Sequence, residues 1–257
     1  MPARDLALIV EAARSAGAVA LRFWKASPQV WEKPGLGPVT EADLAVNTLL
    51  LEGLRTARSD YGWLSEETPD DARRLDCDHV FIIDPIDGTR AFIAGERHFA
   101  VSIAVAHKGE VVAGAVFLPA LDRLYTATRD GAAQMNGQPI ACSARKGLQG
   151  ADILMSKSLL APDHWRGPPP DLKRSFRSSI AYRLCLVADG SNDGMITARD
   201  SWEWDIAAGS LIAARAGAGV SDRAGQPLRF NSAAAKTPGI LVAPAALHRQ
   251  LVADFRA

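Results

Sequence analysis

The stretch VFIIDPIDGT, residues 80–89, constrains the fold most, because it joins an apolar run directly to paired acids. Its first four residues are consecutively apolar, which is typical of a buried strand. Asp84 and Asp87 follow, on either side of Pro85 and its neighbour Ile86. Carboxylates gathered in one place repel each other and become protonated unless a cation neutralises them. The stretch therefore predicts a core strand that ends at a cation site.

The composition fits a globular protein with a sizeable core. The chain has 257 residues, of which 48% are hydrophobic, enough for one large domain or two small ones. The net charge is zero and no basic stripe alternates with aromatic residues, which argues against a nucleic-acid polymer as partner. No apolar run approaches the roughly 18 residues needed to span a bilayer, so we expect no transmembrane segment. Acids near the start argue against a secretory signal. Three scattered cysteines suggest reduced thiols in a cytoplasmic protein.

The hydrophobic pattern predicts two unlike halves. Residues 4–25 and 40–58 have the spacing of amphipathic helices, and residues 32–38 between them predict a loop. Four leucines of the second helix are expected to face inward: Leu44, Leu50, Leu51 and Leu54. Apolar strands follow to about residue 140, and after a polar boundary at 142–150 strands alternate with helices. This order predicts an α+β domain at 1–147 and an α/β domain at 148–257.

Further acids stand at the ends of predicted elements rather than on solvated faces. Asp43 lies in the first turn of the second helix, Glu66 and Glu67 end a short strand, and Asp205 begins an alanine-rich helix. Each has a purely structural alternative. Thr40 and Asp43 can form a capping box, the glutamates can belong to an acidic loop, and Asp205 can be an N-cap. Taken together, these hard oxygen ligands suit Mg²⁺ or Mn²⁺.

The residues that follow the core strand add the parts of a phosphate site. Pro85 fixes the local backbone, so that both aspartates can face one centre with the Ile86 carbonyl between them. Gly88 allows close approach, and the amides of a following helix start can hold a phosphate oxygen. Thr89 offers a hydroxyl that can orient a water. Metals, a phosphate cradle and a positioned hydroxyl together predict hydrolysis of a phosphate ester by activated water.

Four motifs in order carry a family resemblance: VTEAD (39–43), SEE (65–67), DPIDGT (84–89) and WDIAAG (204–209). They resemble those of the inositol monophosphatase family of Mg²⁺-dependent, lithium-sensitive phosphatases, and the resemblance covers nearly the whole chain. It implies a layered αβαβα sandwich, of the inositol monophosphatase and fructose-1,6-bisphosphatase-like type. It also implies catalysis, although a non-catalytic regulatory or binding protein on the same fold remains the alternative from a different class.

The resemblance implies the metal ligands residue by residue. Glu66, Asp84 and the Ile86 carbonyl would hold one Mg²⁺, and Asp84, Asp87 and Asp205 would hold a second. A third, weaker ion is part of the same expectation. The first half of the chain would thus supply most ligands and the second half the last. By the same resemblance Li⁺ would inhibit, and the protein would be a homodimer.

The remaining roles around the metals follow from the same resemblance. Thr89, oriented by Asp43, would position the attacking water, so that Asp43 could cap its helix and hold Thr89 at once. Glu67 would hold a metal-bound water or the third ion. Lys33 matches a family lysine near that water. Ser65 departs from the family, which usually has glycine there, but it affects the backbone rather than a ligand.

The substrate determinants are expected in the second half. No acid occurs at 194–199, where the inositol branch carries one, whereas Arg183 stands where the bisphosphate nucleotidase branch carries a lysine. A cation there could bind a second phosphate, unless Arg183 merely lies on a solvated helix face. Glu203, directly before Trp-Asp, also resembles the nucleotidase branch. We therefore expect a 3′(2′),5′-bisphosphate nucleotidase whose substrate contacts are Gly88, Thr89, Arg183 and Asp205. The alternatives are an inositol-1-monophosphatase and a sugar- or histidinol-phosphate phosphatase.

Overall fold

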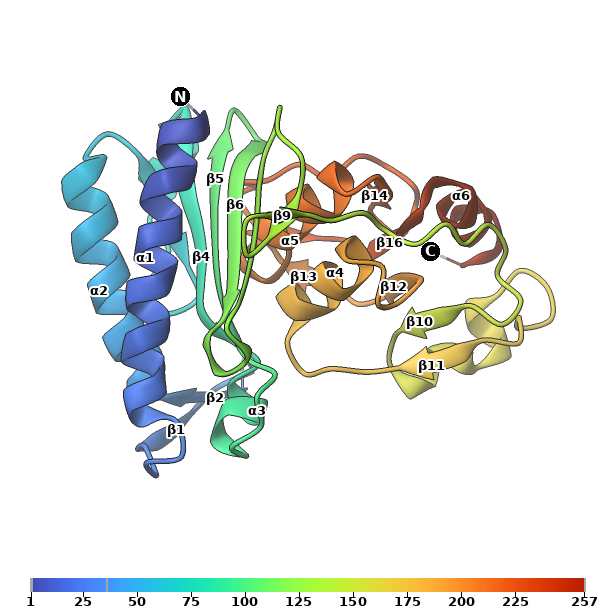
Figure 1. Ribbon diagram of the computed structural model, residues 1–257, viewed down its shortest axis with the longest axis horizontal. Coiled ribbons are helices and arrows are strands. Elements are labelled where there is room, and N and C mark those ends of the chain that lie inside the picture. The colour runs from blue at the N-terminus through green and yellow to red at the C-terminus, as the bar shows by residue number, and fades with distance from the viewer. Residues whose placement is uncertain (1, 36, 257) are drawn as a thin grey trace.

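The computed structural model describes residues 2–35 and 37–256, and its elements stack in five layers of an αβαβα sandwich (Figure 1). Helices α1 (Pro2–Phe23) and α2 (Glu41–Ala57) form the first layer. They cover one face of a seven-stranded sheet, and α4 (Ile180–Ala188) and α5 (Glu203–Arg215) cover the other. The same two helices lie against a five-stranded sheet, which α6 (Ala245–Asp254) covers from outside. The predicted layered sandwich is confirmed.

The larger sheet contains the predicted core strand. Its strands run in the order β3, β4, β5, β6, β7, β8, β9, and only β3 and β4 are parallel. Their bounds are β3 Gly62–Ser65, β4 His79–Asp87, β5 Ala100–His107, β6 Glu110–Leu118, β7 Arg123–Thr128, β8 Gln134–Met135 and β9 Gln138–Pro139. The hairpin of β5 and β6 turns at Lys108 and Gly109, both with positive φ.

The smaller sheet has the order β11, β10, β12, β16, β14. Strands β11, β10 and β12 are parallel, whereas β16 is antiparallel to β12 and β14. Its strands are β10 Asp152–Leu154, β11 Lys173–Ser175, β12 Gly194–Thr197, β14 Ala218–Ser221 and β16 Ile240–Pro244. Each sheet draws its strands from one predicted half of the chain. However, α4 and α5 from the second half pack on both sheets, so the domain boundary at 147 and 148 stays a prediction.

Alternation along β4 decides which way its side chains face. Val80 and Ile82 lie in the cluster that packs on α4 and α5, whereas Phe81 and Ile83 lie in the cluster under α1 and α2. Because successive strand residues point to opposite faces, the next residue, Asp84, points toward α5. The apolar strand is thus covered on both sides and delivers an acid to the middle layer.

Short elements join the layers. The predicted loop at 32–38 is instead a hairpin of β1 (Val30–Lys33) and β2 (Gly37–Thr40); Leu36 lies outside the described residues. A five-residue helix, α3, follows β4, and β13 pairs with β15 just before α5. Their bounds are α3 Thr89–Ile93, β13 Ser201–Trp202 and β15 Lys236–Thr237. Four 3₁₀ turns lie at Ala72–Asp76, Pro119–Leu121, Lys157–Leu160 and Pro162–His164.

The inward face of α2 differs from the prediction. Leu50 and Leu54 are buried as expected, but Leu44 is 42% exposed and Leu51 is only partly buried. The buried stripe begins instead with Asp43 and Asn47, which are polar. In the described ranges, no helix combines the length and the apolar character that a membrane crossing needs.

Candidate active site

A β-bulge places both aspartates of β4 on one face of the sheet. Residues three apart on a regular strand face opposite sides. Here Asp84 pairs with Ser102 and Asp87 with Ala100, so one extra residue is inserted in β4. Pro85 lies within this bulge, where its missing N–H costs no ladder hydrogen bond. Both carboxylates therefore face α4 and α5.

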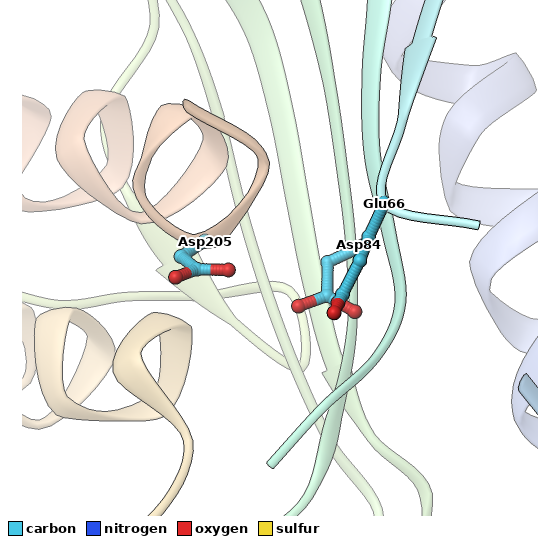
Figure 2. Close-up of side chains that lie close together, drawn as sticks. All are labelled: Glu66, Asp84 and Asp205. Atoms are coloured by element: carbon cyan, nitrogen blue, oxygen red, sulfur yellow. The ribbon is translucent and has the colours of Figure 1, made fainter. Parts of the chain in front are cut away.

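Three acids from distant parts of the chain converge at this point. Carboxylate oxygens of Glu66, Asp84 and Asp205 all lie within 4.8 Å of one another. Glu66 follows β3, Asp84 ends the regular part of β4, and Asp205 extends from the first turn of α5 toward the other two (Figure 2). Adjacent parallel strands bring the first two together, and the packing of α5 on the sheet brings the third.

Asp87 lies in the same pocket but is also tied to α4. Its Oδ2 accepts hydrogen bonds from the Ser179 hydroxyl at 2.7 Å and the Ala181 amide at 2.6 Å. Ser179 is the N-cap of α4 and also accepts from the amide of Tyr182 at 2.9 Å. These bonds leave Asp87 Oδ1 for a ligand and fix the start of α4 next to the acids.

Glu67 does not line the pocket but is neutralised by the β1–β2 hairpin. Lys33 Nζ donates to Glu67 at 2.6 Å and to Glu66 at 2.8 Å. Burial lowers the pKa of Lys33, but the two carboxylates outweigh it and raise that pKa above its ordinary value. The Lys33 ammonium therefore stays charged and partly neutralises the acid cluster at its edge.

Asp43 caps its helix and contacts Thr89 at once. Its Oδ2 accepts from the amide and the hydroxyl of Thr40, at 2.8 and 2.5 Å, in a capping box. Its Oδ1 lies 3.4 Å from the Thr89 hydroxyl, which is also 3.2 Å from the Ile86 carbonyl oxygen. The predicted contact is present, and the catalytic role inferred from it stays a prediction.

Gly88 is required at the turn that follows the acids. Its φ is +92°, and an added Cβ would lie 3.2 Å from the His98 carbonyl oxygen and 3.2 Å from Ser179. Only glycine adopts this conformation without strain and leaves room for both neighbours. The chain then turns directly into α3, so Gly88, Thr89 and Arg90 all line the pocket.

Arg183 is buried rather than solvated, which rules out the solvated-face alternative. It is 7% exposed and lines the pocket with Asp87 and Asp205, whose charges act on it. Burial nevertheless lowers the pKa of Arg183 to about 10, so it remains charged at neutral pH. Its Nε and Nη2 donate to the carbonyl oxygens of Arg177 and Ser178. Nη1 makes no hydrogen bond within the described residues and remains for a ligand.

One network of the site could not be anticipated from motifs. Glu203, fully buried two positions before Asp205, accepts from the amides of Asn231 and Ser232, and the Asn231 bond is 2.5 Å. Arg74 donates to the Asn231 side chain at 2.6 Å and to Asp70 at 2.6 Å. Glu203 thus points away from the pocket and anchors the start of α5 to the segment after the paired glutamates. The burial of these charges is not visible in the sequence, so no sequence signal points to this network.

The pocket's electrostatics favour a cation. Burial, then Glu66 and Asp87, raises the pKa of Asp84 well above its ordinary value. Burial, then Asp87 and Glu66, does the same for Asp205, and burial raises the pKa of Asp87 to about 6. Such a set is costly when ionised unless a divalent cation is present. A compact, all-oxygen donor set of this kind fits Mg²⁺.

The comparisons with known proteins agree with this geometry. A sequence model of the inositol monophosphatase family matches residues 2–257. The chain belongs to the inositol monophosphatase family. Members of this family are Mg²⁺-dependent phosphatases, and this member is accordingly a metal-dependent phosphoric monoester hydrolase.

Relatives within the family carry different names at similar identity. The chain is 37% identical over 206 residues to an inositol-1-monophosphatase of Rhizobium meliloti, covering 76% of each chain. It is 31% identical over 234 residues to the 3′(2′),5′-bisphosphate nucleotidase CysQ of Escherichia coli, covering 86% of this chain and 92% of that one. The crystal structure of extragenic suppressor protein suhB from Bartonella henselae has a TM-score of 0.84 at 29% identity, covering 97% of each chain. The substrate therefore has to be argued from the pocket.

Proposed function

We propose that this family member is a 3′(2′),5′-bisphosphate nucleotidase that releases the 3′-phosphate of adenosine 3′,5′-bisphosphate. The observation that carries the proposal is the buried Arg183 in the pocket wall beside Asp87 and Asp205. Its fixed guanidinium can donate charge-assisted hydrogen bonds from Nη1 to an anionic group. A substrate with a second phosphate uses this cation, whereas inositol monophosphate has nothing to pair with it.

The metal ligands are part of the same proposal. Glu66, Asp84, Asp87, Asp205 and the Ile86 carbonyl would hold two or three Mg²⁺ ions, and Mn²⁺ can replace them. When bound, the cations withdraw charge from the phosphoryl oxygens and make water at the site more acidic. Inhibition by Li⁺ follows as an expectation from the family.

The chain's own residues orient the reaction. The Thr89 hydroxyl donates toward Asp43, 3.4 Å away, or toward the Ile86 carbonyl oxygen. Its free lone pairs can then accept a hydrogen bond from the attacking water and aim that water at phosphorus. Gly88, Thr89 and Arg90 line the pocket, and the amides at this turn can hold the phosphoryl oxygens. Asp205 and Arg183 contact the part of the substrate that departs.

The proposal places the protein in the cytoplasm, because Cys77, Cys142 and Cys185 are free thiols, as a reducing compartment leaves them. We also propose that the protein forms a homodimer, and this part rests on the family resemblance alone.

The test is Mg²⁺-dependent phosphate release from adenosine 3′,5′-bisphosphate, inositol 1-phosphate and sugar phosphates. We expect the nucleotide to have the highest kcat/KM. Arg183→Gln should raise KM for the nucleotide about ten-fold or more and leave KM for inositol 1-phosphate unchanged. Arg183→Lys, which keeps the charge, should lie between. A preference of the wild type for inositol 1-phosphate contradicts the proposal.

One other substrate has specific support. The relative with 37% identity is named an inositol-1-monophosphatase, and the same panel decides for or against that substrate. Absence of phosphate release from every ester at saturating Mg²⁺ would contradict the assignment as a phosphatase.

A further inference from the structure

An exposed aromatic ring lies at the outer part of the pocket. Phe176 follows β11 and is 45% exposed, although it lines the same cavity of about 830 Å³ as the acid cluster. A single large apolar side chain that is exposed on an open surface is common and usually has no function. This one instead forms part of the wall of a pocket whose inner end is made of carboxylates.

The segment that carries Phe176 is anchored to the site. Ser179, three positions later, donates to Asp87 at 2.7 Å, and Arg183 donates to the Arg177 carbonyl oxygen between them. Both bonds hold the 176–179 segment against the start of α4. The ring is therefore kept at a set distance from the acids rather than carried on a free loop.

One face of the ring is stacked against a cation of the protein. The Arg183 guanidinium lies over it, 4.3 Å from the ring centroid. Because the side chain is 45% exposed and lines the pocket, the ring remains accessible to a ligand beside the cation that the proposed function assigns to the second phosphate. An aromatic face next to a guanidinium complements a group that is flat, aromatic and close to an anion.

We propose that Phe176 is the platform on which the base of a nucleotide substrate stacks. The inference rests on the proposed function and adds a second recognition element to it, because a phosphate on Arg183 and a base on Phe176 belong to one nucleoside bisphosphate. Stacking of a base on an aromatic side chain tolerates any base. The platform therefore predicts selection for nucleotides over polyol and sugar esters, with little discrimination between adenine and other bases.

The test compares adenosine 3′,5′-bisphosphate with an abasic analogue, tetrahydrofuran 3′,5′-bisphosphate, which keeps both phosphates. The wild type should use the nucleotide with a KM about ten-fold lower than that of the analogue. Phe176→Leu keeps an apolar side chain without a ring and should abolish that difference by raising KM for the nucleotide only. Phe176→Tyr keeps the ring and should preserve it, with kcat unchanged in both variants.

The outcomes separate this inference from the proposed function. If Phe176→Leu leaves KM for the nucleotide unchanged, or raises KM for both compounds equally, the platform is refuted while the nucleotidase assignment stands. If the wild type uses neither bisphosphate but hydrolyses inositol 1-phosphate, both fall. Loss of the base-dependent difference in the Leu variant, with retention in the Tyr variant, supports the platform.

Discussion

Replacing Asp43 with Asn should make the metal-free protein more stable and the enzyme less active. Asp43 is 1% exposed, and burial raises its pKa from 3.8 to about 7. Asparagine keeps an oxygen for the Thr40 amide but carries no charge. At about 1.4 kcal/mol per pH unit, ionising this buried carboxyl costs up to about 4 kcal/mol. For a chain of this length that corresponds to a rise in Tm of at most about 7 °C.

The sign of the pH dependence follows from the raised pKa. Below about pH 4 the carboxyl is protonated in both the folded and the unfolded chain, so the contribution of Asp43 to stability is fully present there. It is lost as the pH rises through about 7. The advantage of Asp43→Asn should therefore grow from pH 5 to pH 8, whereas kcat with Mg²⁺ should fall about 100-fold because Thr89 loses its charged partner.

The assay is thermal unfolding in EDTA at pH 5, 6, 7 and 8, combined with phosphate release in Mg²⁺. Asp71→Asn is the matched control, because Asp71 is exposed and its pKa is lowered by Arg73. The Tm of Asp71→Asn should not increase relative to that of the wild type as the pH rises. A constant or shrinking difference between Asp43→Asn and the wild type would refute the reasoning.

Three further perturbations test other parts of the site. Adding Mg²⁺ should raise Tm more at pH 8 than at pH 5.5, because the raised pKa values of Asp84 and Asp205 leave them protonated in acid. Equal rises in Tm at the two pH values, measured by scanning fluorimetry, would contradict this. Lys33→Met should lower the free energy of unfolding of the metal-free protein by about 1–2 kcal/mol in urea denaturation, because two carboxylates lose their partner. It should also enlarge the rise in Tm that Mg²⁺ causes. An unchanged urea midpoint would contradict the role of the ion pair. Arg74→Met should lower the free energy of unfolding by about 3 kcal/mol and weaken Mg²⁺ binding in calorimetry. Arg73→Met, on the exposed side of the same turn, should change neither quantity. If the two variants behave alike, the network does not hold the site.

Much of the site was readable because it follows one buried strand. The apolar run before Asp84 predicts a core strand, and its end predicts where the acid lies. The sequence does not show the bulge, because a bulge is a property of pairing with β5, where Asp84 and Asp87 oppose Ser102 and Ala100. The sequence predicts that both aspartates can face one centre, and the structure shows that a bulge is what places them there.

The errors on α2 have the same origin as the site. Hydrophobic periodicity assumes that the inward face of a helix is apolar. Here Asp43 and Asn47 occupy the buried stripe, Asn47 bonding to Ser65 at 2.7 Å, and Leu44 is displaced to the exposed side. Polar residues that serve a site thus shifted the predicted face by one position.

Long-range contacts explain what else was missed. Arg74 and Asn231 are 157 positions apart and meet because the loop after β14 reaches the β5–β6 turn, where the Phe230 amide donates to the Gly109 carbonyl oxygen. The strands at 30–40 are four residues each, too short for periodicity to separate them from a loop rich in Gly and Pro.

The central claim is that acids from both halves of the chain share bound divalent cations. Anomalous diffraction from crystals grown with Mn²⁺ tests it most directly. We predict one anomalous peak at coordinating distance from Glu66 and Asp84 and a second from Asp84, Asp87 and Asp205, with loss of the second peak in the Asp205→Asn variant. A pocket without an anomalous peak at millimolar Mn²⁺, or peaks none of which Asp205 contacts, would contradict the account.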